Sequence, residues 1–375
     1  MGLRTVFQPE LSHYATSKRP FFEGWYCKMV TPRGEMLAVI PGYFKGKDSS
    51  EDHAFIQIYD TIRNKSAFIR YPAAAYRASS QYLEVEIAGT RLSSRGISLD
   101  IDAFDDQGVR WNLTGTVTFS QLRPWPRSLL SPNAMGWYSF VPFMECNHAV
   151  LSFDHTLQGI ITDKLTGNIY DFSGGRGYIE KDWGSSFPSE YLWLQGNQFA
   201  RTPGASIFLS IATIPWLGST FPGYIGGLWL GDGRHEFHIF AKYNGSSILA
   251  LRADEKNVLV VLHRRNHIMR ISAHRDRAVP LSAPYHGSMQ TKILESAGTA
   301  VEVELFALPA SVPSRAILDD KRLFERLCEI RTPHAAAQAS GTELELRGTE
   351  LVFRDTTTAA CLETVGDLCR LSTRR

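Results

Sequence analysis

Alternation of apolar and polar residues with a period of two is the feature that most constrains the fold of this chain. The pattern is clear over 83–87 and returns over 97–101 after a turn at Gly96. It recurs at 111–113, 117–119, 208–212, 237–239, 268–270, 301–305 and 344–346. Such alternation, broken by Gly, Asn and Asp about every ten residues, is typical of antiparallel sheets. Because the second face of many strands is polar, we expect an all-β sandwich or up-and-down barrel and not a βαβ fold.

The predicted strands fall into two runs, 25–180 and 190–308. A chain of 375 residues is long enough for about two domains. We therefore expect an N-terminal β-barrel domain over 1–187 and a C-terminal one over 188–375. The second domain would include a short helix near 318–330, ended by Pro333, and an Ala-rich linker over 334–340. Two final strands within 341–370 would return to close one barrel.

Charge and cysteine content exclude several classes of protein. Forty Lys and Arg residues against 38 Asp and Glu give a net charge of +2, whereas nucleic-acid binders usually carry a strong basic excess. Five cysteines form neither a disulfide framework nor a CxxC zinc motif. We expect buried thiols in a reducing compartment, with no metal, no nucleic-acid partner and no obligate protein partner.

The sequence favours a cytoplasmic location. The N-terminus lacks the apolar run of a signal peptide, and Glu10 argues against a transit peptide. Residues 202–231 carry no charge, but three prolines and several glycines interrupt them, which favours buried strands and turns over a transmembrane helix. Peripheral membrane contact stays open as an alternative, through a loop containing Pro215, Trp216, Leu217, Phe221 and Pro222.

Acidic chemistry is suggested by the segment Glu180-Lys181-Asp182-Trp183. On a strand, Glu180 and Asp182 face one side and Lys181 the other. Two carboxylates on one face would repel, and burial would raise the pKa of at least one, leaving a neutral acid able to donate a proton. The alternative is that both carboxylates form salt bridges at the rim, or that Asp182 caps a turn.

The histidines and arginines allow further interpretations. His148 and His155 with Asp154 suggest a metal site, but no third ligand follows at a suitable spacing, which favours a structural role for His155. His238 is interpreted as a surface residue. The Arg-rich run 263–277 is interpreted as the solvated face of two strands, with an anionic headgroup site as the alternative.

Aromatic residues are abundant, with 8 Trp, 14 Tyr and 21 Phe. Most of them fill a β core in the simplest interpretation. A barrel interior lined with such rings would also hold an apolar or prenylated ligand and could stabilise a carbocation by cation–π attraction.

Three motifs carry a resemblance to a known family. The run Phe22–Lys28, FEGWYCK, resembles the FEGWYFK signature of the tocopherol cyclase family. Residues 177–188, GYIEKDWGSSFP, resemble that family's central motif, which residues 193–199 continue. Residues 362–367 are similar to a closing strand of bacterial members.

The resemblance implies a fold and a chemistry. The fold would be a pair of lipocalin-like (calycin) antiparallel β-barrels. The reaction would be acid-catalysed cyclisation, or hydration, of a prenylated quinol or isoprenoid through a carbocation, without a redox cofactor or metal. A non-catalytic lipocalin-like carrier of an apolar or isoprenoid metabolite remains the alternative, and so does a barrel that merely folds a polyene for a pericyclic reaction.

The resemblance also implies site residues. Asp182 is our first choice for the acid and Glu23 the second, because each lies between aromatics that would desolvate it. Glu180 is a third candidate, and His148 would orient the acid or the phenol. The expected substrate-binding residues are Trp25, Tyr26, Asn147, Trp183, Trp193, Gln195 and Asn197.

Two positions depart from the family pattern. Cys27 replaces a frequent aromatic, and Asp182 stands where plant members often carry Asn. The second departure bears on the choice of acid, since it gives weight to Glu23 or Glu180 if plant members work without a carboxylate there.

Overall fold

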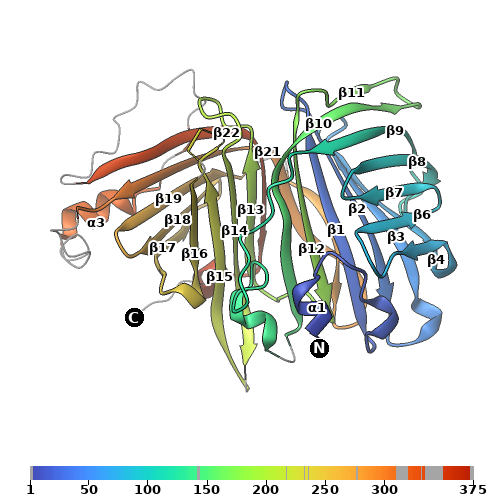
Figure 1. Ribbon diagram of the computed structural model, residues 1–375, viewed down its shortest axis with the longest axis horizontal. Helices are drawn as coiled ribbons and strands as arrows, with labels where there is room; N and C mark the ends of the chain where they lie inside the picture. Colours follow the sequence, from blue (N-terminus) through green and yellow to red (C-terminus); the bar gives the residue numbers. More distant parts are fainter. Residues whose placement is uncertain are drawn as a thin grey trace. The chain divides into compact units, whose positions relative to one another are not determined.

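In the structure, a computed structural model, antiparallel strands form most of the regular secondary structure (Figure 1). It describes residues 3–141, 144–216, 218–231, 233–234, 236–275, 278–309, 320–330, 332–333 and 349–371. Contacts divide the chain into two compact units. The first comprises Met1–Pro188 with Val279–Ile293, and the second comprises Ser189–Ala278 with Leu294–Arg375.

The first unit contains a twelve-stranded antiparallel sheet. Its order is β4-β3-β2-β1-β12-β10-β9-β8-β7-β6-β5, with β11 paired to β10. The strands are β1 (Phe21–Val30), β2 (Met36–Lys45), β3 (His53–Asp60), β4 (Lys65–Pro72), β5 (Tyr76–Ala78), β6 (Glu84–Ile87), β7 (Thr90–Ser93), β8 (Gly96–Phe104), β9 (Arg110–Ser120), β10 (Cys146–Asp163), β11 (Ile169–Asp171) and β12 (Arg176–Gly184).

Period-two alternation places the core of this unit. In β8, Ile97, Leu99 and Ile101 are buried while the residues between them are more exposed, so one face of the strand packs inward. Strands β1 and β12 differ, because they are buried on both faces. The sheet curls so that β6 contacts β2 and β3 across the core. A strand that is covered on both sides can carry one set of buried functional side chains on one face and a different set on the other.

The second unit contains most of a ten-stranded antiparallel sheet. Its order is β16-β15-β14-β13-β22-β21-β19-β18-β17, with β20 paired to β21. The strands are β13 (Tyr191–Asn197), β14 (Ser206–Trp216), β15 (Ser219–Trp229), β16 (Phe237–Ala241), β17 (Ser247–Ala253), β18 (Asn257–Arg264), β19 (His267–His274), β20 (Val279–Tyr285), β21 (Ser288–Ala307) and β22 (Glu350–Val365). Leu192, Leu194 and the alternate residues of neighbouring strands form its apolar core.

Segment 279–293 groups with the first unit although it comes late in the chain. The hydroxyl of Ser66 donates to the carbonyl of Pro280 at 2.6 Å. The amide of Ser282 donates to Oε1 of Gln57 at 2.8 Å. These bonds tie β20 to β4 and β3.

Helical structure is short. Among the described residues, the α-helices are α1 (Leu3–Phe7) and α3 (Lys321–Leu327), and the 3-10 turns are η1 (Tyr14–Thr16), η2 (Ser49–Glu51), η3 (Ala73–Ala75), η4 (Gly136–Phe140), η5 (Lys242–Asn244) and η7 (Leu368–Leu371). The predicted helix near 318–330 is thus present but shorter, starting after Asp320, whose side chain accepts from the amide of Leu323. Residues 334–340 of the expected linker lie outside the described residues, as do 341–348 of the expected closing strands.

The predicted fold class is confirmed: over the described residues the chain is all-β, with two curled antiparallel sheets and a short helix toward the C-terminus. The uncharged stretch 202–231 forms the β14–β15 hairpin, as the interruptions by proline indicated. Leu217, at its tip, lies outside the described residues. Across the described part of the chain, we find no helix with both the length and the apolar character needed to cross a membrane.

Candidate functional site

Strand β12 organises the candidate site because it lies between β1 and β10 and carries the Glu-Lys-Asp-Trp segment. Across β1, Asp182 is opposite Gly24 and Glu180 is opposite Tyr26. Across β10, Asp182 is opposite His148. The expectation that Glu180 and Asp182 share one face of the strand is confirmed, since both contact His148.

On that face, His148 and three residues of β12 form what we call the His148 cluster: His148, Tyr178, Glu180 and Asp182. Nδ1 of His148 is 2.8 Å from Oδ1 of Asp182, and Nε2 is 3.6 Å from Oε2 of Glu180. The hydroxyl of Tyr178 donates to Oε2 of Glu180 at 2.5 Å. The His148 imidazole therefore lies between the carboxylates of Asp182 and Glu180. The Tyr178 phenol also donates a hydrogen bond to the Glu180 carboxylate.

The two carboxylates determine the charge of this cluster. Burial opposes a positive charge on His148, but the negative charges of Asp182 and Glu180 and the hydrogen bond to Asp182 outweigh burial and raise its pKa to about 9. His148 is therefore an imidazolium at neutral pH. Burial, together with the nearby carboxylates, also raises the pKa of the Cys146 thiol well above its ordinary value, so this neighbouring thiol stays protonated.

The same residues are the ones that could hold a metal ion. Among the described residues, His148, Glu180 and Asp182 offer ligand atoms that all lie within 4.8 Å of one another. One histidine and two carboxylates would suit a divalent cation. A cation would have to displace the proton that the two carboxylates hold on the ring. This set differs from the grouping of His148, His155 and Asp154 that the sequence suggested, because Glu180 and Asp182 come from β12, some thirty residues further along the chain.

The opposite face of the same strands carries a buried ion pair between Glu23 of β1 and Lys181 of β12. Oε2 of Glu23 is 2.9 Å from Nζ of Lys181, and neither side chain is exposed to solvent. Glu23 also accepts from the hydroxyls of Ser12 and Tyr76 and from the amide of His13. This carboxylate is therefore fully surrounded by donors.

These contacts correct the expectation that Glu23 is a neutral acid. Burial would raise its pKa, but the Lys181 ammonium and the donors from Ser12 and His13 outweigh burial and lower it. Burial lowers the pKa of Lys181, and Glu23 offsets part of that effect. Glu23 is thus an ionised structural partner without a proton to donate at neutral pH.

The expected aromatic residues divide between the two faces. Nζ of Lys181 lies 4.4 Å from the ring centroid of Trp25 and 5.3 Å from that of Trp183, so a cation of the protein already occupies these rings. Asn147 donates from Nδ2 to the carbonyl of Trp183 at 3.3 Å. Tyr26 lies opposite Glu180 and shares its face of the sheet, on the side of the His148 cluster.

The remaining expected residues, Trp193, Gln195 and Asn197, belong to β13 of the second unit. All three are buried and alternate with the core residues Leu192 and Leu194, so they share the other face of that strand. The role expected for them in substrate binding stays a prediction.

His155 has the structural role that the sequence favoured. Its ring is fully buried, and Nδ1 lies 3.0 Å from the hydroxyl of Ser152. Burial lowers its pKa to about 3, so the ring is neutral. Asp154 does not join it at a metal, because its carboxylate pairs with Arg176.

Sequence reasoning missed several residues of the His148 cluster and several of those that surround the Glu23–Lys181 ion pair. Tyr178 could have been found, because it precedes Glu180 by two residues and the period of two puts it on the same face. Lys181 was placed on the correct face, but its partner was not foreseen. Ser12, His13 and Tyr76 gave no signal, because they come from irregular or very short segments.

Comparison with known proteins connects this site to a family. Residues 95–213 match the model of a family described as tocopherol cyclase-like. The resemblance indicated by the motifs is thereby confirmed over this part of the chain. The matched region contains the whole His148 cluster, whereas Glu23 and the FEGWYCK run lie outside it.

Two plant proteins are similar in sequence. A probable chloroplastic tocopherol cyclase of Oryza sativa subsp. japonica is 23% identical over 253 residues, which cover 51% of this chain and 50% of that protein. The chloroplastic tocopherol cyclase of Zea mays is 34% identical over 71 residues, 19% of this chain and 14% of that one. The chain thus spans at most about half the length of these curated relatives.

Three solved structures are similar in shape. A putative AttH of Nitrosomonas europaea has a TM-score of 0.44 at 12% identity, covering 96% of this chain and 95% of that one. CghA with Sch210972 has a TM-score of 0.47 at 8% identity, covering 92% and 88%. Kievitone hydratase of Nectria haematococca has a TM-score of 0.43 at 9% identity, covering 97% and 95%.

Proposed function

We propose that this protein catalyses acid-promoted cyclisation, or hydration, of a prenylated quinol or related isoprenoid, with the His148 cluster as the proton source. The observation that carries the proposal is the 2.8 Å contact of His148 with Asp182, beside Glu180, inside the region that matches the tocopherol cyclase-like family. Names of the plant relatives support the same reaction class.

Asp182 is the carboxyl group that donates the proton in this proposal. Its side chain is 22% exposed, whereas that of Glu180 is 4% exposed and accepts from Tyr178. A substrate can therefore reach Asp182 more easily. Glu180 keeps His148 charged, and Glu23 serves the stability of the first unit through Lys181.

The proton that the cluster holds at neutral pH is the one on the His148 ring, which lies 2.8 Å from Oδ1 of Asp182. Transfer of that proton along this contact gives a neutral imidazole and a carboxylic acid at Asp182, which donates the proton to the substrate. The proton adds to one alkene carbon, whose π electrons form the C–H bond, and the other carbon becomes a tertiary cation.

The cation is then captured by an oxygen. In cyclisation, the phenol oxygen of the substrate forms the C–O bond and its proton returns to the Asp182 carboxylate, so the product is an isomer of the substrate. In hydration, a water molecule forms the bond instead and the product gains one water. Tyr26, on the face of Glu180, is the aromatic ring proposed to stabilise the cation, since the rings of Trp25 and Trp183 already face Lys181.

The experiment uses the purified full chain with a prenylated hydroquinone in D2O. We expect an isomeric chromanol that contains one deuterium on carbon, detected by mass spectrometry. Asp182→Asn and His148→Gln are each expected to lower turnover by about 100-fold or more, because general acid catalysis typically contributes that much. Asp102→Asn, which removes an exposed carboxylate on β8, is the matched control and should retain full activity.

Other outcomes are informative. Recovery of bound lipid unchanged, with no turnover of any prenylated substrate, would favour the carrier function. Full turnover by a folded Asp182→Asn protein would reject Asp182 as the acid. Retained rate in both Asp182→Asn and His148→Gln would favour a barrel that folds a polyene without acid catalysis.

A further inference from the structure

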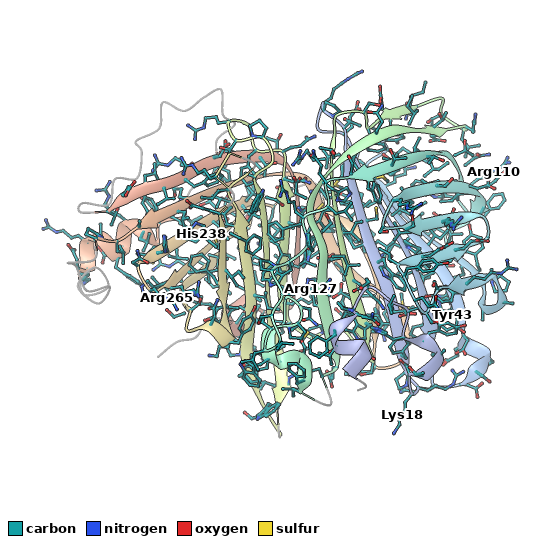
Figure 2. All side chains as sticks on the ribbon, in the orientation of Figure 1. Lys18, Tyr43, Arg110, Arg127, His238 and Arg265 are labelled. Carbon is teal, nitrogen blue, oxygen red and sulfur yellow. The ribbon has the colours of Figure 1, made fainter. Side chains whose placement is uncertain are left out.

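A small hollow opens in the second unit, far along the chain from the His148 cluster. Its volume is about 130 Å³, and it is lined by 237–240 of β16 and by 264–267 at the turn between β18 and β19. Its polar lining comes from His238, Arg264, Arg265, Asn266 and His267. His238 and Arg265 are labelled in Figure 2.

The structure changes the interpretation of these residues. The side chain of His238 is only 16% exposed, so it is not the surface residue expected from the sequence. The Arg-rich run 263–277 is not uniformly solvated either, since Arg270 is buried and pairs with Glu304 at 2.7 Å. His238 and the start of that run instead face one hollow.

The two imidazoles in the hollow are in contact. The ring centroids of His238 and His267 are 4.9 Å apart at an interplanar angle of 61°. Nε2 of His238 is 3.4 Å from Oε2 of Glu236, whose side chain is 55% exposed. In the part of the chain that the structure describes, the ring of His267 forms no hydrogen bond, so its N–H can reach a ligand.

The guanidinium of Arg264 has further N–H groups that could donate hydrogen bonds to a ligand. Its Nε donates to the carbonyl of Asn244 at 3.5 Å. Within the described ranges, no carboxylate lies at ion-pair distance from it. A half-buried arginine without a carboxylate is unusual, because a buried charge normally has a partner of opposite sign.

Electrostatics and backbone geometry point in the same direction. Burial lowers the pKa of both His238 and His267; the Glu236 carboxylate raises each, and Arg264 lowers each. An anion in the hollow would relieve this repulsion. At the turn, Arg265 has a φ of 53°, a left-handed conformation in which a non-glycine residue is uncommon. This turn places Arg265 beside the hollow.

We infer that this hollow binds a small oxyanion of the phosphate class, either free phosphate or the phosphate of a monoester headgroup. A guanidinium fork, the N–H of the His267 ring and a second arginine at the rim match the several acceptor oxygens of such an anion. A metal ion fits less well, because Arg264 would repel it.

The test measures binding of inorganic phosphate to the full chain by calorimetry. Arg264→Gln and His267→Gln are each expected to weaken binding by about tenfold or more, since each removes a charge-assisted hydrogen bond. Lys256→Gln removes an exposed positive charge at the β17–β18 turn of the same unit and should leave affinity unchanged. Far-UV circular dichroism of each variant confirms folding, and Arg264→Lys should show an intermediate loss.

Vesicles distinguish the two sources of phosphate. Binding to phosphatidylcholine vesicles only when they contain phosphatidate, lost in Arg264→Gln and not in Lys256→Gln, would assign a headgroup. Binding of free phosphate with no preference for those vesicles would assign the soluble anion. Equal phosphate affinity in all variants, or none in the wild type, would overturn the inference. Zn²⁺ binding that needs His238 and His267 but not Arg264 would overturn it as well.

Discussion

The carboxylate of Glu23 and the ammonium of Lys181 form an ion pair 2.9 Å long in which neither side chain is accessible to solvent. The pair joins β1 to β12 on the face opposite the His148 cluster. Desolvation of two charges is costly, and loss of one partner leaves the other charge buried without compensation.

We therefore expect Glu23→Gln to destabilise the protein by about 3–5 kcal/mol. The measurement is urea unfolding followed by circular dichroism. The double variant Glu23→Gln/Lys181→Met, which removes both charges, should be more stable than Glu23→Gln alone. A loss below about 1 kcal/mol in the single variant would show that the pair does not hold the strands together.

Stability should depend on pH through His148. Its pKa in the folded protein is about 9, above the ordinary value of 6.5. A raised pKa means that the stabilisation is complete below pH 6.5 and is lost as pH rises from there through 9. The loss should reach about 3 kcal/mol, and it should be absent in His148→Gln. Equal slopes for the two proteins over this range of pH would contradict the assignment.

Glu180 is expected to tune the proton on His148. Glu180→Gln removes one of the two negative charges near the ring, so the pKa of His148 should fall by about one unit or more. Titration of the His148 ring protons by NMR measures this directly. If the proposed reaction needs the imidazolium, the alkaline limb of the pH–rate profile should move by the same amount, while Asp102→Asn leaves both unchanged.

Gly177 makes room for His155. A Cβ at Gly177 would lie 2.2 Å from Nε2 of the ring, which is fully buried and in contact with Phe119. Gly177→Ala should therefore cost about 1–3 kcal/mol in the free energy of unfolding. Because His155→Ala removes the clash, the two substitutions should be non-additive in a double-mutant cycle. Simple additivity would indicate that the ring moves aside freely.

The sequence predicts the local part of this structure well. Alternation over 97–101 becomes β8, and the period of two places Glu180 and Asp182 together, because both depend only on neighbours along the chain. The partner that a residue contacts on a neighbouring strand is harder to predict. Whether Lys181 meets Glu23 or another group depends on which strands pair and in which register, and period alone does not specify that.

The charge states also escaped prediction. The sequence suggested two carboxylates competing for a proton, whereas the structure inserts His148 between them and pairs Glu23 with Lys181. At His148 two nearby carboxylates outweigh the effect of burial on the pKa, and at Glu23 the Lys181 ammonium does. The direction of these pKa shifts depends on which charged groups are close in three dimensions, and the residue types along one strand do not reveal that.

Strand β12 presents Glu180 and Asp182 on one side and Lys181 on the other, and both sides are covered. Loss or gain of one residue within it would carry the lysine toward His148 and drive two acids into the apolar interior. Lengthening or shortening this strand by one residue should therefore disrupt the first unit. An insertion at an exposed turn such as 164–167, which connects β10 to β11, should be tolerated instead.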